Sequence, residues 1–96
     1  MPNYKLERLE KGETFVTKEK GNSMTPIIKS NQEHKLAPCT LEQAQVGDIV
    51  YCKVRGSWMT HIVFAKHADK GVLIGNNHGH MNGWTKRVYG KVIEVL

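Results

Sequence analysis

Short segments of alternating polarity, most of them ended by a glycine-containing turn, fill the second half of the chain. In residues 48–55, DIVYCKVR, the side chains of Val50, Cys52 and Val54 fall on one face of an extended chain and Tyr51 falls on the other. A repeat of two residues is typical of a strand that is buried on one face. Many such segments at close spacing, separated by turns, indicate an all-β protein. The sequence therefore predicts an all-β fold of short antiparallel strands.

The same signals place the other elements along the chain. Further strands are expected at residues 13–18, 35–39, 58–66, 72–75 and 86–95. Other segments are expected at residues 4–11, a helical turn or arm, at 40–48, a turn or brief helix, and at 75–83, a long Gly/Asn/His loop. Pro38 cannot donate a backbone hydrogen bond, so residues 35–39 should form an edge strand. Gly90 lies inside the last strand, where it predicts a bulge or bend.

Length and composition indicate one domain over residues 1–96, with residues 1–12 as a possible N-terminal arm. Hydrophobic residues make up 40% and charged residues 24% of the chain, as in ordinary soluble domains. The first residues lack the apolar core of a signal peptide, and no window approaches the ~18 apolar residues of a membrane span. We therefore expect a cytoplasmic protein with two reduced thiols, Cys39 and Cys52, and no cofactor.

The net charge of +5 favours an acidic partner such as nucleic acid or anionic lipid. Lysine and arginine are nevertheless spread along the whole chain, with no run of five and no basic stripe interleaved with aromatic residues. A surface that only keeps the protein soluble would carry the same charge. Charge alone therefore leaves nucleic-acid binding as one alternative.

The stretch GNSMTP, residues 21–26, places a serine on a tight Gly-Asn corner. Serine is a common turn residue, so Ser23 taken alone is most simply explained as part of a bend. The same corner can also hold a hydroxyl group where it meets a substrate. A serine hydroxyl becomes a good nucleophile only beside a base, so the rest of the chain has to decide between the two interpretations.

The order of the later motifs is more specific than any single one. Ser-Met-x-Pro at 23–26 is followed by Gly-Asp-Ile-Val at 47–50, His-Ile-Val at 61–63, Gly-Asn-Asn at 75–77 and Gly-Lys-Val at 90–92. In this order the motifs resemble those of the signal peptidase and LexA-like superfamily of serine peptidases, over most of the chain. The resemblance implies a coiled β-fold, a pseudo-barrel of short antiparallel strands, with a nucleophilic serine on the corner and its base on a neighbouring strand.

The resemblance also implies roles for individual residues. His61 lies 38 residues after Ser23, at the position of the family's base, and histidine is the base in the archaeal and endoplasmic-reticulum signal peptidases. Asn76 stands where those relatives carry an aspartate that orients the histidine. The backbone N–H of Ser23 is a candidate oxyanion donor. Asn22 and Met24 are further candidates for oxyanion or substrate binding.

Asparagine at the third position changes the expected chemistry. Asn76 can hold a histidine tautomer, but its neutral amide cannot stabilise an imidazolium by charge, a loss of about 10⁴ in rate in a serine hydrolase. Asp48 and Asp69 are possible substitutes. Lys53 and Lys66 could act as lysine-type bases, but neither aligns with the position of the base.

Three functions follow from these observations. The first is a serine peptidase that uses a Ser–His dyad to cleave an extended peptide or protein substrate in trans. The second is a catalytically silent peptidase-like domain that binds a protein or a nucleic acid, which would suit a phage or mobile element. The third is a metal-binding domain in which His78 and His80 share a metal with Cys39 or Cys52.

Overall fold

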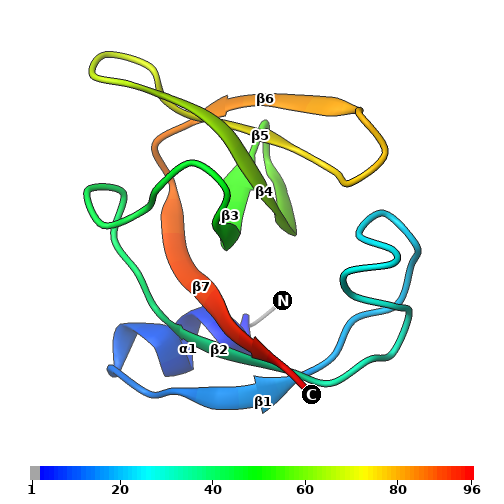
Figure 1. Ribbon diagram of the computed structural model, residues 1–96. Coiled ribbons are helices and arrows are strands. Elements are labelled where there is room, and N and C mark those ends of the chain that lie inside the picture. Colours follow the sequence, from blue (N-terminus) through cyan, green and yellow to red (C-terminus); the bar gives the residue numbers. More distant parts are fainter. Residues whose placement is uncertain (1–2) are drawn as a thin grey trace.

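The computed structural model describes residues 3–96, which form seven strands and one helix (Figure 1). In chain order the elements are α1 (Tyr4–Glu10), β1 (Phe15–Thr17), β2 (His34–Pro38), β3 (Ile49–Val54), β4 (Ser57–His67), β5 (Gly71–Gly75), β6 (Met81–Thr85) and β7 (Val88–Val95). Every pair of neighbouring strands is antiparallel. The predicted all-β fold is confirmed.

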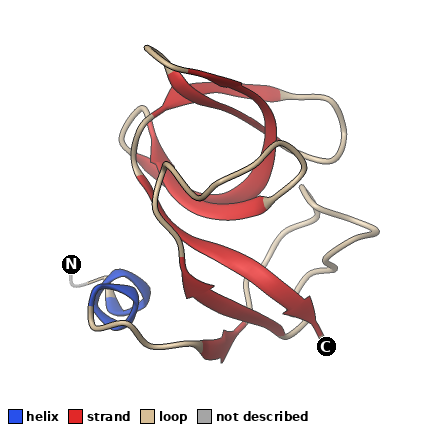
Figure 2. Cartoon of the chain, turned by 60° about the vertical axis from the view of Figure 1, so that its left-hand side comes forward, coloured by secondary structure: helices blue, strands red, loops and turns tan. Residues whose placement is uncertain are grey.

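The strands form one sheet in the order β1-β2-β7-β3-β4-β5-β6. β3 to β6 curl into a ring at one end of the molecule, while β1, β2 and α1 lie at the other end (Figure 2). β7 joins the two ends because its N-terminal part pairs with β3 and its C-terminal part pairs with β2. The long segment between β1 and β2 is an irregular loop beside the ring, and it carries Ser23 (Figure 1).

Two clusters of buried side chains fill these two ends. The larger one lies within the curled strands and contains Cys39, Ala44, Val50, Cys52, Val54, Val63, Val72, Ile74 and Val88. The smaller one contains Leu9, Phe15, Leu36 and Tyr51. The alternation predicted for β3 is confirmed, since Val50, Cys52 and Val54 enter the first cluster and Tyr51 enters the second.

α1 is capped and docked at its two ends. The Asn3 side chain accepts a hydrogen bond from the Leu6 N–H at 3.0 Å, as an N-cap residue does. Asn3 Nδ2 also donates to the Tyr51 hydroxyl at 2.9 Å. Leu9 packs so closely on β7 that a Cβ at Gly90 would lie 2.8 Å from Leu9 Cδ1. The N-terminal segment is thus a helix held against the sheet. Within residues 3–96, no helix has the length and apolar character needed to cross a membrane.

The sequence pattern does not predict β6. A loop is expected over 75–83, yet the loop ends at His80 and β6 begins at Met81. The strand has Asn82 and Gly83 at positions where local preference disfavours a strand. Its pairing with the buried strand β5 supplies the stabilisation that local preference lacks.

Pro38 predicts an edge strand, but β2 lies between β1 and β7. β1 is so short that it pairs only with residues 34–36, and Pro38 lies beyond its reach. β2 is therefore internal over its first three residues and an edge at the proline. The predicted irregularity at Gly90 is present, because the register between β3 and β7 shifts beside it.

Candidate active site

Ser23 lies on a corner that is fixed by the backbone around it. Gly21 has a φ of +119°, a conformation that side chains rarely adopt. The Thr25 N–H and hydroxyl both donate to the Asn22 carbonyl, at 3.2 and 2.9 Å. The Met24 side chain is buried and anchors the corner in the protein. Ser23 itself stays partly exposed.

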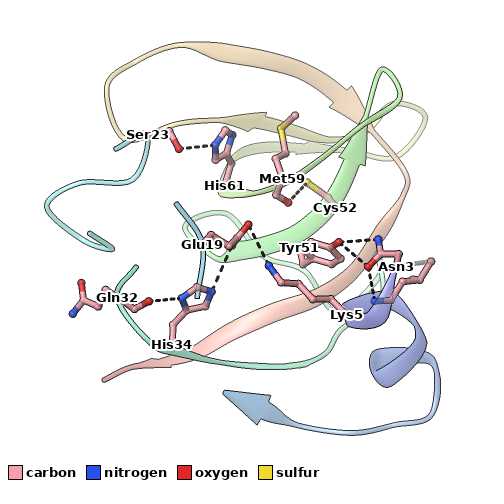
Figure 3. A network of polar contacts seen from close by, with 11 residues as sticks. Asn3, Lys5, Glu19, Ser23, Gln32, His34, Tyr51, Cys52, Met59 and His61 are labelled. Carbon is pink, nitrogen blue, oxygen red and sulfur yellow. Dashed lines mark hydrogen bonds and ion pairs between the residues drawn. The ribbon is translucent and has the colours of Figure 1, made fainter. Parts of the chain in front are cut away.

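His61 lies within β4, opposite Val50 of β3. Its Nε2 atom lies 3.1 Å from Ser23 Oγ (Figure 3). This distance is within the reach of a nucleophile and its general base. The fold thus brings together the two residues, 38 apart in the chain, that the order of motifs singles out.

Asn82 of β6 contacts the other nitrogen of the same ring. Its Oδ1 atom lies 2.9 Å from His61 Nδ1. A carbonyl oxygen only accepts hydrogen bonds, so in the neutral ring Nδ1 carries the proton and Nε2 is left to accept from Ser23. This is the tautomer that a general base requires.

A bulge explains why Asn82 is available for this contact. The register between β5 and β6 shifts after the pair Ile74–Gly83, so Asn82 has no residue opposite it on β5. Bulges are common at the rims of barrels and beside active sites, where they change the direction of one side chain. Sequence periodicity carries no signal for such a position.

Asn76, the residue predicted to orient His61, has a different role. Its Oδ1 accepts the backbone N–H groups of His78 and His80 at 2.8 and 3.1 Å. These bonds turn the loop back on itself, so the next strand rather than the loop meets the imidazole. The predicted assignment of Asn76 as the partner of His61 is wrong, and Asn82 occupies that place.

The next two residues of this loop bind the serine corner. Asn77 donates its backbone N–H to the Ser23 carbonyl and its Nδ2 to the Thr25 carbonyl, both at 2.9 Å. His78 Nε2 lies 2.8 Å from the Asn22 carbonyl oxygen. The loop between β5 and β6 therefore fixes the corner, while the strand that follows it fixes the imidazole.

Backbone donors stand beside the hydroxyl. The N–H groups of Ser23 and Met24 have no backbone acceptor in the part of the chain that the structure describes. Two free N–H groups next to a nucleophile can stabilise an oxyanion. Asn22 shapes this corner through its carbonyl, which accepts from Thr25 and lies beside His78.

A pocket of about 340 Å³ opens beside Ser23 and His61. Its apolar walls come from Met24, Ile28, Trp58 and Met59. Thr60 and Glu19 supply polar groups. The buried Thr60 hydroxyl has no partner at hydrogen-bond distance among residues 3–96, although it lies near enough to Glu19 to favour the charged carboxylate.

Glu19 connects this pocket to α1. Its Oε2 lies 3.4 Å from Lys5 Nζ and its Oε1 lies 3.6 Å from His34 Nε2 (Figure 3). Burial raises the pKa of Glu19, but the polar groups of His34 and Thr60 and the charge of Lys5 outweigh burial and lower the pKa to about 2. The carboxylate thus stays charged and ties the helix to the segment that leads into Ser23.

Glu19→Gln should make the stability of the fold less dependent on pH in acid. The pKa of this carboxyl group is about 2 in the folded protein and 4.5 ordinarily, so its stabilisation is complete above about pH 5 and is lost as the pH falls toward 2. Because one third of the side chain is exposed, we expect a contribution of about 1–2 kcal/mol. Urea unfolding of wild type and variant at pH 7 and pH 2.5 measures it.

Glu94→Gln is the matched control, because Glu94 pairs with Lys35 on an exposed surface. This control should lose stability with acid as wild type does. Equal pH dependence in wild type and Glu19→Gln would show that the Glu19 network contributes nothing to folding.

The other candidate bases and acids lie elsewhere. Lys66 Nζ donates to the Glu42 and Ala44 carbonyls at 2.9 and 2.7 Å, and Lys53 Nζ lies over the Trp58 ring. Asp48 pairs with Lys91, and Asp69 lies in the turn between β4 and β5. The structure does not place any of these four side chains in contact with His61.

The predicted metal ligands are not brought together. Cys39 and Cys52 are free and buried in the core, and burial raises the pKa of the Cys52 thiol to about 12. His78 is engaged with the serine corner. Across the described residues, no group of three or more His, Cys, Asp or Glu side chains is placed to hold a metal ion.

Comparison with known proteins identified no similar protein. A scan against protein-family models, a search of the curated proteins and a search of the solved structures each found no match. The geometry of Ser23, His61 and Asn82 and the order of motifs are therefore the grounds for assigning a function.

Proposed function

We propose that this protein is a serine peptidase of the signal peptidase and LexA-like type that cleaves an extended peptide. The observation that carries the proposal is the continuous series Ser23 Oγ, His61 Nε2, His61 Nδ1 and Asn82 Oδ1, with contacts of 3.1 and 2.9 Å. Three side chains from distant parts of the chain meet in the order nucleophile, base and orienting group. A serine that only formed part of a turn would not require such partners.

The proposed reaction follows the usual two steps of acyl transfer. His61 Nε2 takes the proton of Ser23 as Oγ bonds to the scissile carbonyl carbon, and the N–H groups of Ser23 and Met24 stabilise the oxyanion. The C–N bond then breaks, and His61 returns the proton to the departing amine. Water attacks the acyl-serine with His61 again acting as the base, which releases the acid product and restores Ser23.

Asn82 sets the expected speed of this reaction. Its amide holds the tautomer and orientation of His61 but leaves the imidazolium without a negative charge beside it. We therefore expect slow turnover, because loss of the third-position charge costs about 10⁴ in rate in a serine hydrolase. A peptidase that acts on one presented substrate tolerates such a rate better than a digestive enzyme does.

The surroundings of the dyad favour an extended peptide as the substrate. Among residues 3–96, β1 pairs with β2 alone, so its other edge has no strand partner and could receive an added strand. Phe15, Val16 and Thr17 of β1 line a second pocket. This pocket shares Glu19 and Trp58 with the pocket at the dyad. The two pockets therefore adjoin one another along the segment that leads from β1 to Ser23, where successive side chains of a peptide can be received.

A peptide library read by mass spectrometry tests the proposal. Long incubation of wild type with the library should give new peptide termini with a shared pattern around the cut. Ser23→Ala should give none of them. Cleavage that persists in Ser23→Ala would come from another protein and would remove the dyad from the account.

A further inference from the structure

The net positive charge of this protein comes from one half of the chain. Residues 1–48 contain seven Lys or Arg residues and seven Asp or Glu residues, so they carry no net charge. Residues 49–91 contain seven Lys or Arg residues and a single acidic residue, Asp69. The even spread of cations in the sequence hides this asymmetry, because it is the acidic residues that are concentrated in the first half. The curled strands β3–β6 therefore form a basic body.

Five of these cations have neither a carboxylate nor a carbonyl partner for their charged group among residues 3–96. Lys91 pairs with Asp48 and Lys66 is bound to backbone carbonyls. The ion pairs found among residues 3–96 include none of the remaining five, which are Lys53, Arg55, Lys70, Lys86 and Arg87. All five are exposed or partly exposed. Unpaired cations on one body of a protein create a positive potential that attracts polyanions.

Four of these five cations gather around one segment, residues 83–87. Lys53 is not among them, because its Nζ lies 5.3 Å from the centre of the Trp58 ring, which lines the pocket at the dyad. The Arg55 Nε atom would lie 3.3 Å from a Cβ at Gly83, so its guanidinium lies against this segment. Lys70 comes from the turn between β4 and β5, and Lys86 and Arg87 belong to the segment itself.

Trp84 adds an exposed aromatic ring at the same place. The residue is 38% exposed, although it lies in a strand of a small protein with few large apolar residues to form a core. Lys70 Nζ lies 5.5 Å from the centre of the ring, and His67 meets the ring edge-on at 6.3 Å. An exposed ring beside a lysine can stack on an unpaired base while the ammonium group contacts a phosphate.

We propose that this surface, formed by Trp84 and the four unpaired cations around residues 83–87, binds single-stranded nucleic acid. Unpaired bases are favoured because the exposed ring of Trp84 can stack only on a base that is not already stacked within a duplex. The exposed tryptophan favours a base over an acidic peptide, since a carboxylate gains nothing from a flat ring. This surface is separate from Ser23 and His61 in its residues, so the inference does not depend on peptidase activity.

Fluorescence anisotropy with a fluorescein-labelled 20-nucleotide oligo-dT and oligo-rU tests the proposal on the full chain. Binding should be measurable at 50 mM salt and should weaken about 50-fold at 200 mM, as expected for four phosphate contacts. No binding at 50 mM salt would overturn the proposal.

Charge-matched double variants test whether binding occurs at this surface or results only from the net charge of the protein. Lys86→Gln/Arg87→Gln should weaken binding at least tenfold, whereas Lys11→Gln/Lys18→Gln, which removes the same charge from the neutral half, should change it less than threefold. Trp84→Leu should weaken binding at least fivefold. Lys70→Gln provides a second test of the same place should Trp84→Leu fail to fold. Equal weakening by the two double variants would contradict the proposal.

Competition with polyglutamate tests whether this surface binds nucleic acid or an acidic protein. Polyglutamate at the same charge concentration should displace the oligonucleotide poorly, because it cannot use Trp84. Displacement as effective as that by unlabelled oligo-dT would assign the surface to acidic protein instead. Labelling of Ser23 should be unchanged in all of these variants, so failure here and failure of the peptidase proposal are distinguishable.

Discussion

His61→Ala should lower the rate at which a phosphonate probe labels Ser23 by about 10³-fold or more. The hydroxyl would lose the only imidazole within reach of Oγ among the described residues, at 3.1 Å. Without a base, the serine stays protonated at neutral pH and attacks slowly. Stopped time courses of labelling, read by intact mass, give the rates for wild type and variant.

His67→Ala is the matched control on the same strand. His67 is exposed and contacts Trp84 rather than the dyad. Its removal should leave the labelling rate within about twofold of wild type, because no hydrogen bond to Ser23 is lost. A His61→Ala protein that is folded and still labels as fast as wild type would show that the imidazole is not the base.

Asn82→Asp should raise the labelling rate by roughly 10- to 10³-fold. A carboxylate at Oδ1, 2.9 Å from His61 Nδ1, would stabilise the imidazolium that forms as Ser23 loses its proton. The reverse exchange costs about 10⁴ in a serine hydrolase, and an unevolved carboxylate should recover only part of that. Asn82→Leu should lower the rate by about tenfold or more, because the ring loses its orienting acceptor.

Asn76→Asp is the control that tests which residue orients His61: Asn82, as in the structure, or Asn76, as expected from the sequence. Asn76 binds backbone N–H groups of its own loop, so a carboxylate there should leave the labelling rate nearly unchanged. Acceleration by Asn76→Asp, with none by Asn82→Asp, would show that the loop rather than β6 orients the histidine.

The sequence predicts most of this fold because strands with one buried face carry a clear local signal. β3 alternates, so Val50, Cys52 and Val54 enter one cluster and Tyr51 enters the other. β6 carries no such signal, since Asn82 and Gly83 interrupt it and its strand conformation depends on β5. The internal position of β2 is also a non-local property, because it depends on how far β1 reaches.

In the candidate site, too, some residues can be predicted from the sequence and others cannot. Ser23 and His61 can be found from the order of motifs, and the fold brings them to 3.1 Å. Asn82 could not be found, because its contact arises from a bulge in a strand that has no local signal. Glu19 was equally hidden: a charged residue between two lysines suggests a solvated loop, and only folding places it between Lys5 and His34.

The central claim is that Ser23 is an activated nucleophile, and an intact-mass measurement after incubation with a fluorophosphonate tests it most directly. Folded wild type should gain the mass of one adduct, located on Ser23 by peptide mapping, and folded Ser23→Ala should gain none. Heat-unfolded wild type should also gain none, because an ordinary serine does not react. No adduct on folded wild type, or an adduct that persists in Ser23→Ala, would contradict the claim.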